Sequence, residues 1–255
     1  MGKTVFIECH GRLTMDMLTG SLLDMGVPFP YLEGELRRAA PEEVPLWGSC
    51  STAQIKAAYF HIPPRPHKEL LLKEQELLDR WNELCSKGGK EWKETGWKVI
   101  SALGDGASEA LDIPADIVDF GRCGVVRENV VSLYAFLVCM EYLSADRMYV
   151  CPIDLKPAES EKGRSAECML KRNGTTESHP IAPELIEPFA AAALEGMAAD
   201  FLPMDSRFLP EKTAYGTDSS TAPGGDNTVA AYIGYFTDRK KSVFDSSVKI
   251  FGVEP

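Results

Sequence analysis

Hydrophobic positions along the chain predict short strands that alternate with longer helices. An apolar strand at 5–7 ends in a polar turn, and apolar residues then recur at helical spacing as far as Met25. Thr14 is placed to cap this helix, and Gly26, followed by Val-Pro, is placed to end it. A second short helix is predicted over 29–40. We expect the rest of the chain to be arranged around this opening strand, turn and helix.

The remaining elements continue the alternation. Two loosely alternating stretches, 44–49 and 54–62, are expected to form a pair of strands. Further helices are predicted at 68–86, 91–103, 125–143 and 183–201, and further strands at 147–155, 164–171, 208–215 and 228–236. The acidic, glycine-rich stretch between residues 104 and 124 is expected to be a loop with a weak helix.

This order of elements predicts an α+β fold, with a mixed sheet and several long helices packed on it. At 255 residues the chain is long enough to bury a sizeable core. We expect residues 1–255 to form a single compact domain or two closely packed subdomains, with a subdivision near 105–120.

The charge of the chain restricts its partners. A net charge of −11 disfavours a nucleic-acid backbone or an anionic membrane surface, and it does not hinder the binding of a divalent cation. The longest apolar run, 130–140, is too short to span a bilayer. Because no signal-peptide pattern opens the chain, a cytoplasmic protein is expected.

Cysteine and histidine spacing gives no ready-made metal site. The seven cysteines contain no CxxC pair, which indicates reduced thiols, most of them buried as small apolar residues. The four histidines show neither HxxxH nor HxH spacing. The loop at 217–227 has two adjacent glycines and several hydroxyl groups that could bind an anion, although a single Gly-Gly turn is weak support.

Candidate chemistry gathers in the turn after the first strand. Glu8, Cys9, His10 and Asp16 bring carboxylate, thiol and imidazole groups to one place, where a metal or an anionic cofactor could use them. The alternative is structural, since Asp16 in the first turn of a helix is favoured by the positive end of the helix dipole.

Several segments, in chain order, resemble the LarC-like nickel-insertion family, which completes the nickel-pincer nucleotide cofactor of lactate racemase. The stretch LSADRMYVCPIDL is similar to a helix end and strand of that family. The other matching positions are Cys9, Asp16-Met17-Leu18, Gly20, Leu22-Leu23-Asp24, Gly26, Glu184, Leu185, Pro188, Ala191, Tyr215, Gly216, Asn227 and Gly234.

The resemblance implies a set of site residues and a metal. Cofactor-binding positions would be Asp16, Tyr215, Gly216 and Asn227. Nickel ligands would come from Glu8, Cys9, His10, Asp16, Asp119 and Cys123, with His10 standing where the family has phenylalanine. If these six residues form one metal site, their side chains should converge within about 6 Å.

The sequence also departs from the family pattern. Where the family has His-Phe-His-Glu-Val-Gly, residues 119–124 read Asp-Phe-Gly-Arg-Cys-Gly, and Arg127 and Val131 replace two aspartates. The family's Thr-Pro-Thr-Gly reads Glu-Pro-Phe-Ala from Glu187. The family's C-terminal domain, which binds CTP and metal, has no counterpart within these residues. The chain therefore resembles a degenerate, single-domain relative of the family's N-terminal half.

Two functional hypotheses follow from the resemblance. In the first, the protein handles nickel or a pincer-type nucleotide during cofactor maturation, in an accessory role or as a nickel chelatase or metal insertase. In the second, it is a non-enzymatic scaffold or regulatory subunit of a LarC-like partner, or a homo-oligomer. A third hypothesis, an unrelated small-molecule enzyme, has little support, because the sequence contains no GxGxxG, P-loop, GxSxG or HExxH motif. By residue type, Cys9 and His10 could be a nucleophile and its base. Adjacent residues in a strand point to opposite faces, however, so they rarely form such a pair.

Overall fold

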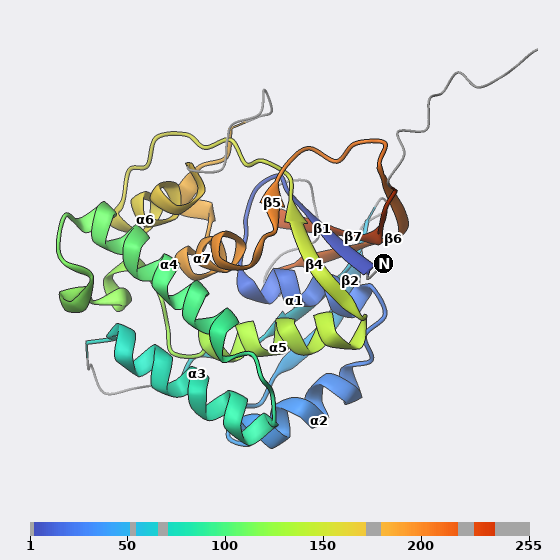
Figure 1. Cartoon of the computed structure of the whole chain (residues 1–255), viewed down its shortest axis with the longest axis horizontal. Coiled ribbons are helices and arrows are strands. Elements are labelled where there is room, and N and C mark those ends of the chain that lie inside the picture. The colour runs from blue at the N-terminus through green and yellow to red at the C-terminus, as the bar shows by residue number, and fades with distance from the viewer. Residues whose placement is uncertain (1–2, 52–54, 66–70, 172–179, 219–226, 238–255) are drawn as a thin grey trace, which may run out of the picture.

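A seven-stranded mixed sheet forms one layer of the protein (Figure 1). The computed structural model describes residues 3–51, 55–65, 71–171, 180–218 and 227–237. In the sheet the strands follow the order β2-β3-β6-β7-β1-β4-β5. Their bounds are β1 Lys3–Cys9, β2 Leu46–Ser51, β3 Lys56–His61, β4 Ala145–Val150, β5 Asp200–Phe201, β6 Phe208–Thr217 and β7 Thr228–Phe236.

Strand directions bring several strand ends to the same edge of the sheet. β1 is parallel to β4, β4 to β5, and β3 to β6, whereas β7 is antiparallel to both β6 and β1. It follows that β1, β3, β4, β5 and β6 all run in one direction. Their carboxyl ends share an edge, which is where sheets of this kind commonly carry their ligand sites.

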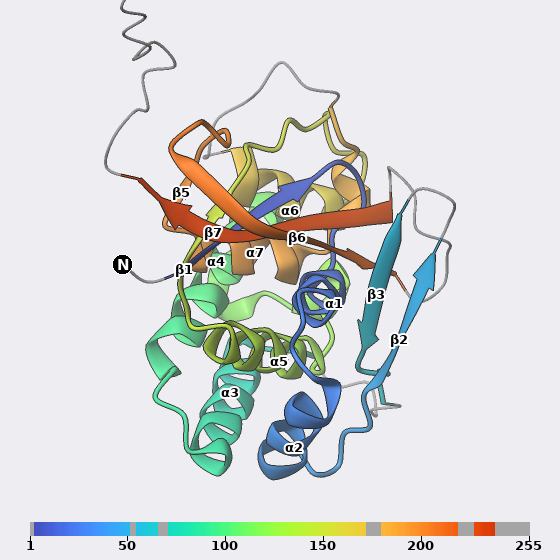
Figure 2. The same ribbon diagram turned by 90° about the vertical axis from the view of Figure 1, so that its right-hand side faces the viewer.

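The helices gather on one side of the sheet (Figures 1 and 2). α1 packs against β3 and β6 on one side and against α5 on the other. The helices are α1 Met15–Asp24, α2 Phe29–Ala39, α3 Glu74–Gly88, α4 Lys93–Leu111, α5 Asn129–Tyr142, α6 Glu161–Leu170 and α7 Pro188–Met197, with short 3-10 turns at Ala115–Ile117, Phe120–Cys123 and Pro183–Leu185. No helix in the described ranges is long and apolar enough to cross a bilayer.

α1 approaches the sheet closely because each side of the contact has a glycine, Gly20 on the helix and Gly216 on β6. A Cβ added at Gly20 would lie 2.6 Å from the carbonyl oxygen of Ala58 on β3. A Cβ at Gly216, on β6, would overlap the carbonyl oxygen of Met17. The helix therefore rests almost directly on the strand backbones. This contact sets the position of every side chain in its first turn.

The ends of α1 follow the sequence prediction. The Thr14 hydroxyl accepts a hydrogen bond from the Met17 amide at 3.1 Å, which satisfies one of the free N–H groups of the first turn. After the helix, Gly26 adopts a φ of +119°, a conformation that side chains disfavour. The predicted pair of strands before the first proline-rich segment is also confirmed, as β2 and β3.

The α+β class is confirmed, and three elements correct the prediction. Residues 164–171 were expected to form a strand but lie mostly in α6, which Ser160 caps by accepting from the Gly163 amide at 3.0 Å. α4 continues to Leu111, through a stretch predicted as loop, because Gly106 lets α6 approach and place Met169 against it. The helix predicted over 183–201 is shorter, 188–197, and is followed by β5.

Replacing Gly216 by alanine should lower the free energy of unfolding by about 1–3 kcal/mol or more, because the new methyl group must displace α1 from β6. Chemical unfolding in urea measures the change. The matched control is Gly34→Ala, on an exposed turn of α2 with nothing within 4 Å, where alanine should raise stability by up to about 1 kcal/mol. Equal effects of the two substitutions would contradict the close-contact account.

Candidate functional site

The predicted metal ligands at the end of β1 face different surroundings. Oε2 of Glu8 accepts a hydrogen bond from the Tyr232 hydroxyl at 2.7 Å, and Oε1 lies 3.4 Å from Nε2 of His10. Cys9 points to the opposite, helix-covered face, where its thiol is directed at the carbonyl oxygen of Gly11. Burial raises the pKa of the Cys9 thiol to about 11, so the metal-binding thiolate is disfavoured.

Asp119 and Cys123 lie apart from that turn and support local structure. The Asp119 carboxylate accepts from the amides of Leu72 at 3.0 Å and Gly121 at 3.1 Å. Cys123 is buried and accepts from the Ser165 hydroxyl at 3.3 Å, and burial raises the pKa of its thiol. Each residue therefore has a structural partner of its own.

The expected convergence of these six residues is not observed. Among the described residues, no three or more His, Cys, Asp or Glu side chains form a group that could hold a metal ion. The physical reason is the alternation of side chains along β1, which sends Glu8 and Cys9 to opposite faces. Individual metal-binding roles for these residues remain predictions.

Asp16 lies at the centre of a different cluster. Its Oδ2 pairs with Nδ1 of His61, the last residue of β3, at 2.7 Å. Its Oδ1 accepts from the hydroxyl of Ser132 on α5 at 2.7 Å. One carboxylate in the first turn of α1 thus joins a strand end and a second helix. Both partners are remote in sequence, 45 and 116 residues away.

The contact with Asp16 defines the chemistry of His61. The hydrogen bond raises the pKa of His61 above its ordinary value of 6.5, despite the opposing effect of partial burial, and Asp218 and Glu187 add to the rise. In the neutral form, an Nδ1–H donated to Asp16 leaves the lone pair on Nε2. Nε2 has no hydrogen-bond partner within the described ranges, and the side chain is 36% exposed. His61 can therefore accept a proton or bind a metal through this nitrogen.

Glu187 is a second carboxyl group beside Asp16, and it is partly buried. Its two oxygens accept from the Met15 amide, at 3.0 Å, and from the Asn129 side chain. Burial, together with the nearby charge of Asp16, raises the pKa of Glu187 to about 7. At neutral pH this carboxyl group is consequently poised between its protonated and ionised forms.

Three helix N-termini and two strand ends meet at this cluster. Glu187 occupies the N-cap position of α7, and its carboxyl group accepts hydrogen bonds from the first residues of α1 and α5. The N-terminal ends of helices carry partial positive charge, which favours the carboxylates placed there. Arg12, after β1, lies 3.6 Å from Asp218, which follows β6. The cluster therefore lies at the shared carboxyl edge of the parallel strands.

Of the other predicted cofactor-binding residues, Tyr215 and Gly216 lie on β6, and Asn227 directly precedes β7. The Tyr215 amide donates to Asp24 at 3.0 Å, and Gly216 makes the close contact with α1. The backbone oxygen of Asn227 accepts from the Thr217 hydroxyl at 2.8 Å. These contacts hold the strand ends together. Cofactor binding by these residues remains a prediction, and most of the predicted glycine-containing loop between β6 and β7 lies outside the described residues.

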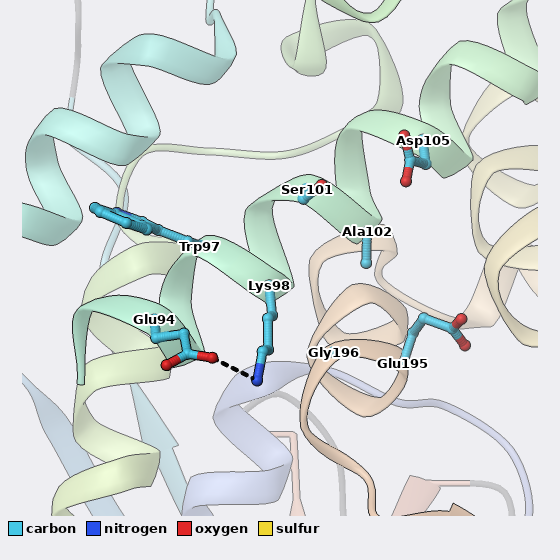
Figure 3. Close-up of a pocket in the computed structure, with 8 residues that line it drawn as sticks. All are labelled: Glu94, Trp97, Lys98, Ser101, Ala102, Asp105, Glu195 and Gly196. Carbon is cyan, nitrogen blue, oxygen red and sulfur yellow. Dashed lines mark ion pairs between the residues drawn. The ribbon is translucent and has the colours of Figure 1, made fainter.

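A large surface hollow lies elsewhere, over α4 and the end of α7 (Figure 3). It has a volume of about 550 Å³, and Glu94, Lys98, Asp105 and Glu195 contribute its charged groups. The Glu94 and Lys98 side chains pair with each other at 3.0 Å along one helix. Glu195 is eight residues after Glu187, about 12 Å further along α7, which separates the hollow from the cluster. We therefore place the candidate site at Asp16 and His61.

Comparison with known proteins gives a consistent family match. A family model described as "Nickel insertion protein" matches residues 5–250. A "putative nickel insertion protein" of Syntrophobacter fumaroxidans is 22% identical over 247 residues, covering 91% of this chain and 60% of the relative. The "pyridinium-3,5-bisthiocarboxylic acid mononucleotide nickel insertion protein" of Geobacillus kaustophilus is 21% identical over 255 residues, with the same coverage of each chain.

A third relative, a "putative nickel insertion protein" of Geotalea uraniireducens, is 23% identical over 217 residues and covers 78% of this chain. The chain spans 53% to 60% of the length of these three curated relatives. No solved structure matches it.

Replacing Glu187 by glutamine should remove a pH dependence of stability. Because the pKa of Glu187 rises from an ordinary 4.5 to about 7, ionisation of the carboxyl group opposes folding. This free-energy cost is absent at pH values below the pKa of the unfolded state. It is complete above the pKa of the folded state, where it amounts to about 3 kcal/mol. Between these pH values, the wild-type protein should thus lose stability with rising pH relative to Glu187→Gln.

Urea unfolding from pH 4 to 8 measures this difference, and the exposed Glu159→Gln serves as control. Parallel stability curves for wild type and Glu187→Gln would contradict the raised pKa.

Proposed function

Because this chain belongs to the nickel insertion protein family, we propose that it handles nickel in the maturation of a nickel-pincer-type nucleotide cofactor. Nickel is the substrate or cargo in this proposal. The relative from Geobacillus kaustophilus supports it through its name, which specifies nickel insertion into a pyridinium bisthiocarboxylic acid mononucleotide. The arrangement of Asp16 and His61 supports it independently.

The single observation that carries the proposal is the hydrogen bond between Asp16 and His61. A metal-ligating histidine usually donates its second ring N–H to a carboxylate, which fixes the tautomer and makes the free nitrogen more basic. Here Asp16 holds Nδ1 at 2.7 Å, and Ser132 holds the carboxylate from the other side. Imidazole nitrogen is also a good ligand for nickel.

We assign distinct roles to the residues of the cluster. His61 would bind the metal through Nε2, and Asp16 would orient the imidazole ring. Glu187 would supply negative charge when ionised, which would favour an arriving cation. A transferred metal must be held weakly enough to leave. A site with one firmly positioned nitrogen ligand suits a transfer step better than a closed four-ligand cage.

A nickel titration by isothermal calorimetry, with the reduced protein, tests this proposal. His61→Ala should weaken nickel binding at least about tenfold, the effect of losing one charge-assisted ligand contact, and Asp16→Asn should weaken it less. Nε2 must be free of its proton to bind metal. The affinity for nickel should therefore rise as the pH increases above the ordinary pKa of histidine.

His10→Ala is the discriminating variant, since the His10 side chain is 60% exposed and lies in the turn after β1. If His10→Ala loses nickel while His61→Ala retains it, the site is the turn predicted from sequence and the proposal is wrong. Unfolding curves of each variant show whether lost binding reflects lost folding. A wild-type protein without nickel affinity would favour a scaffold or regulatory role.

A further inference from the structure

A small cavity lined by charged side chains opens beside the candidate site, at the N-terminus of α5. Its volume is about 180 Å³, below the range of about 300–1,000 Å³ that holds whole small-molecule ligands. It is therefore sized for one functional group of a larger ligand. Its charged lining consists of three guanidinium groups and three carboxylates, from Glu42, Glu43, Arg65, Arg80, Arg127 and Glu128.

Both terminal nitrogens of Arg80, the most buried of the three arginines, bond carboxylates. The side chain is only 8% exposed and bonds Glu83 through Nη1 at 2.9 Å. Its Nη2 bonds Glu42 and lies 3.5 Å from Glu43. Arg80 therefore serves as the fixed base of the cavity.

The other two arginines keep most of their donors free. Nε of Arg65 bonds Glu43 at 3.2 Å, and its backbone amide donates to Glu128 at 3.1 Å. Its terminal nitrogens have no hydrogen-bond partner among the described residues. Arg127 is exposed, and none of its five guanidinium donors bonds any residue in the part of the chain that the structure describes.

The guanidinium groups in this cavity offer more hydrogen-bond donors than the carboxylates there can accept. Both oxygens of Glu43 are occupied by arginines, and Glu42 and one oxygen of Glu128 are also occupied. The carboxylates thus offset the buried charge of Arg80 and orient Arg65. A multi-oxygen anion would satisfy the remaining donors, because guanidinium groups match phosphate and carboxylate geometry.

We propose that Arg65 and Arg127 form a subsite for a phosphomonoester group of the substrate. This inference rests on the proposed function, and it adds where the anionic end of the ligand binds. Val131 lines the cavity, and the next residue, Ser132, donates to Asp16. Arg65 follows His61 by four residues, a chain distance of at most about 14 Å. One ligand can therefore present its metal-binding group to His61 and its phosphate to the two arginines.

Net charge explains why short-range contacts must carry this recognition. At −11 the whole chain does not attract anions over long distances. Binding should consequently depend on the individual guanidinium donors, and most strongly on Arg127, which has no competing carboxylate in the described structure. Because Arg127 is exposed and unpaired, its replacement should leave the fold intact.

Calorimetric titration with three probes in the absence of nickel tests the subsite. The probes are nicotinic acid mononucleotide, the matching nucleoside without phosphate, and inorganic phosphate as a competitor. Wild type should bind the mononucleotide at least about tenfold more tightly than the nucleoside. Arg127→Gln should remove most of this preference, because only Arg65 then remains, whereas Arg127→Lys should keep a larger part of it. Arg37→Gln, on an exposed face of α2, is the control with the same change in net charge.

The outcomes separate this proposal from the proposed function. Equal binding of mononucleotide and nucleoside by wild type, or equal losses in Arg127→Gln and Arg37→Gln, would overturn the subsite. Competition by inorganic phosphate alone, without a gain from the nucleoside portion, would identify a free-phosphate site and overturn its assignment to the substrate. Nickel binding by the His61 variants is measured separately. Failure of the subsite is therefore distinguishable from failure of the proposed function.

Discussion

The structure depends on the close seating of α1 against the backbones of β3 and β6. Gly20 and Gly216 allow this approach, since a side chain at either position would strike a carbonyl oxygen. Because α1 packs closely on these strands, its first turn lies at the carboxyl edge of the sheet. There Asp16 pairs with His61 at the end of β3. A packing constraint thus determines which polar groups come together, and the candidate site follows from it.

Charged groups at that edge change the pKa values of Glu187 and His61. Two carboxyl groups, Asp16 and Glu187, lie near each other where three helix N-termini meet, and burial together with the charge of Asp16 raises the pKa of Glu187 to about 7. Asp16 fixes the imidazole ring of His61 and leaves Nε2 available. At the α5 N-terminus, Arg65, Arg80 and Arg127 line a small cavity together with Glu42, Glu43 and Glu128. The proposed metal-binding group and the proposed phosphate subsite would therefore lie close enough to serve one ligand that carries both a metal site and a phosphate.

Local features of the fold could be predicted from sequence, and long-range features could not. The Thr14 cap, the Gly26 stop and the hydrophobic spacing of α1 are encoded within a few residues, and all were predicted correctly. The segment that forms α6 was read as a strand, whereas it is a helix that Ser160 caps and that packs Met169 against Gly106 of α4. Asp16 was identified from sequence, but His61 was not, because its partner lies 45 residues away. Its position at the end of a predicted strand was the one available signal. The core-facing position of the Cys9 thiol follows from strand alternation, and its metal-binding role stays a prediction.

X-ray absorption spectroscopy at the nickel edge, on the nickel-loaded and reduced protein, tests the central claim most directly. Nickel held by His61 should show imidazole nitrogen and oxygen neighbours and no sulfur, and the imidazole signal should disappear in His61→Ala. Sulfur neighbours at about 2.2–2.3 Å would instead indicate thiolate ligation of the kind expected from Cys9 or Cys123. That result, or an imidazole signal that persists in His61→Ala, would contradict the account.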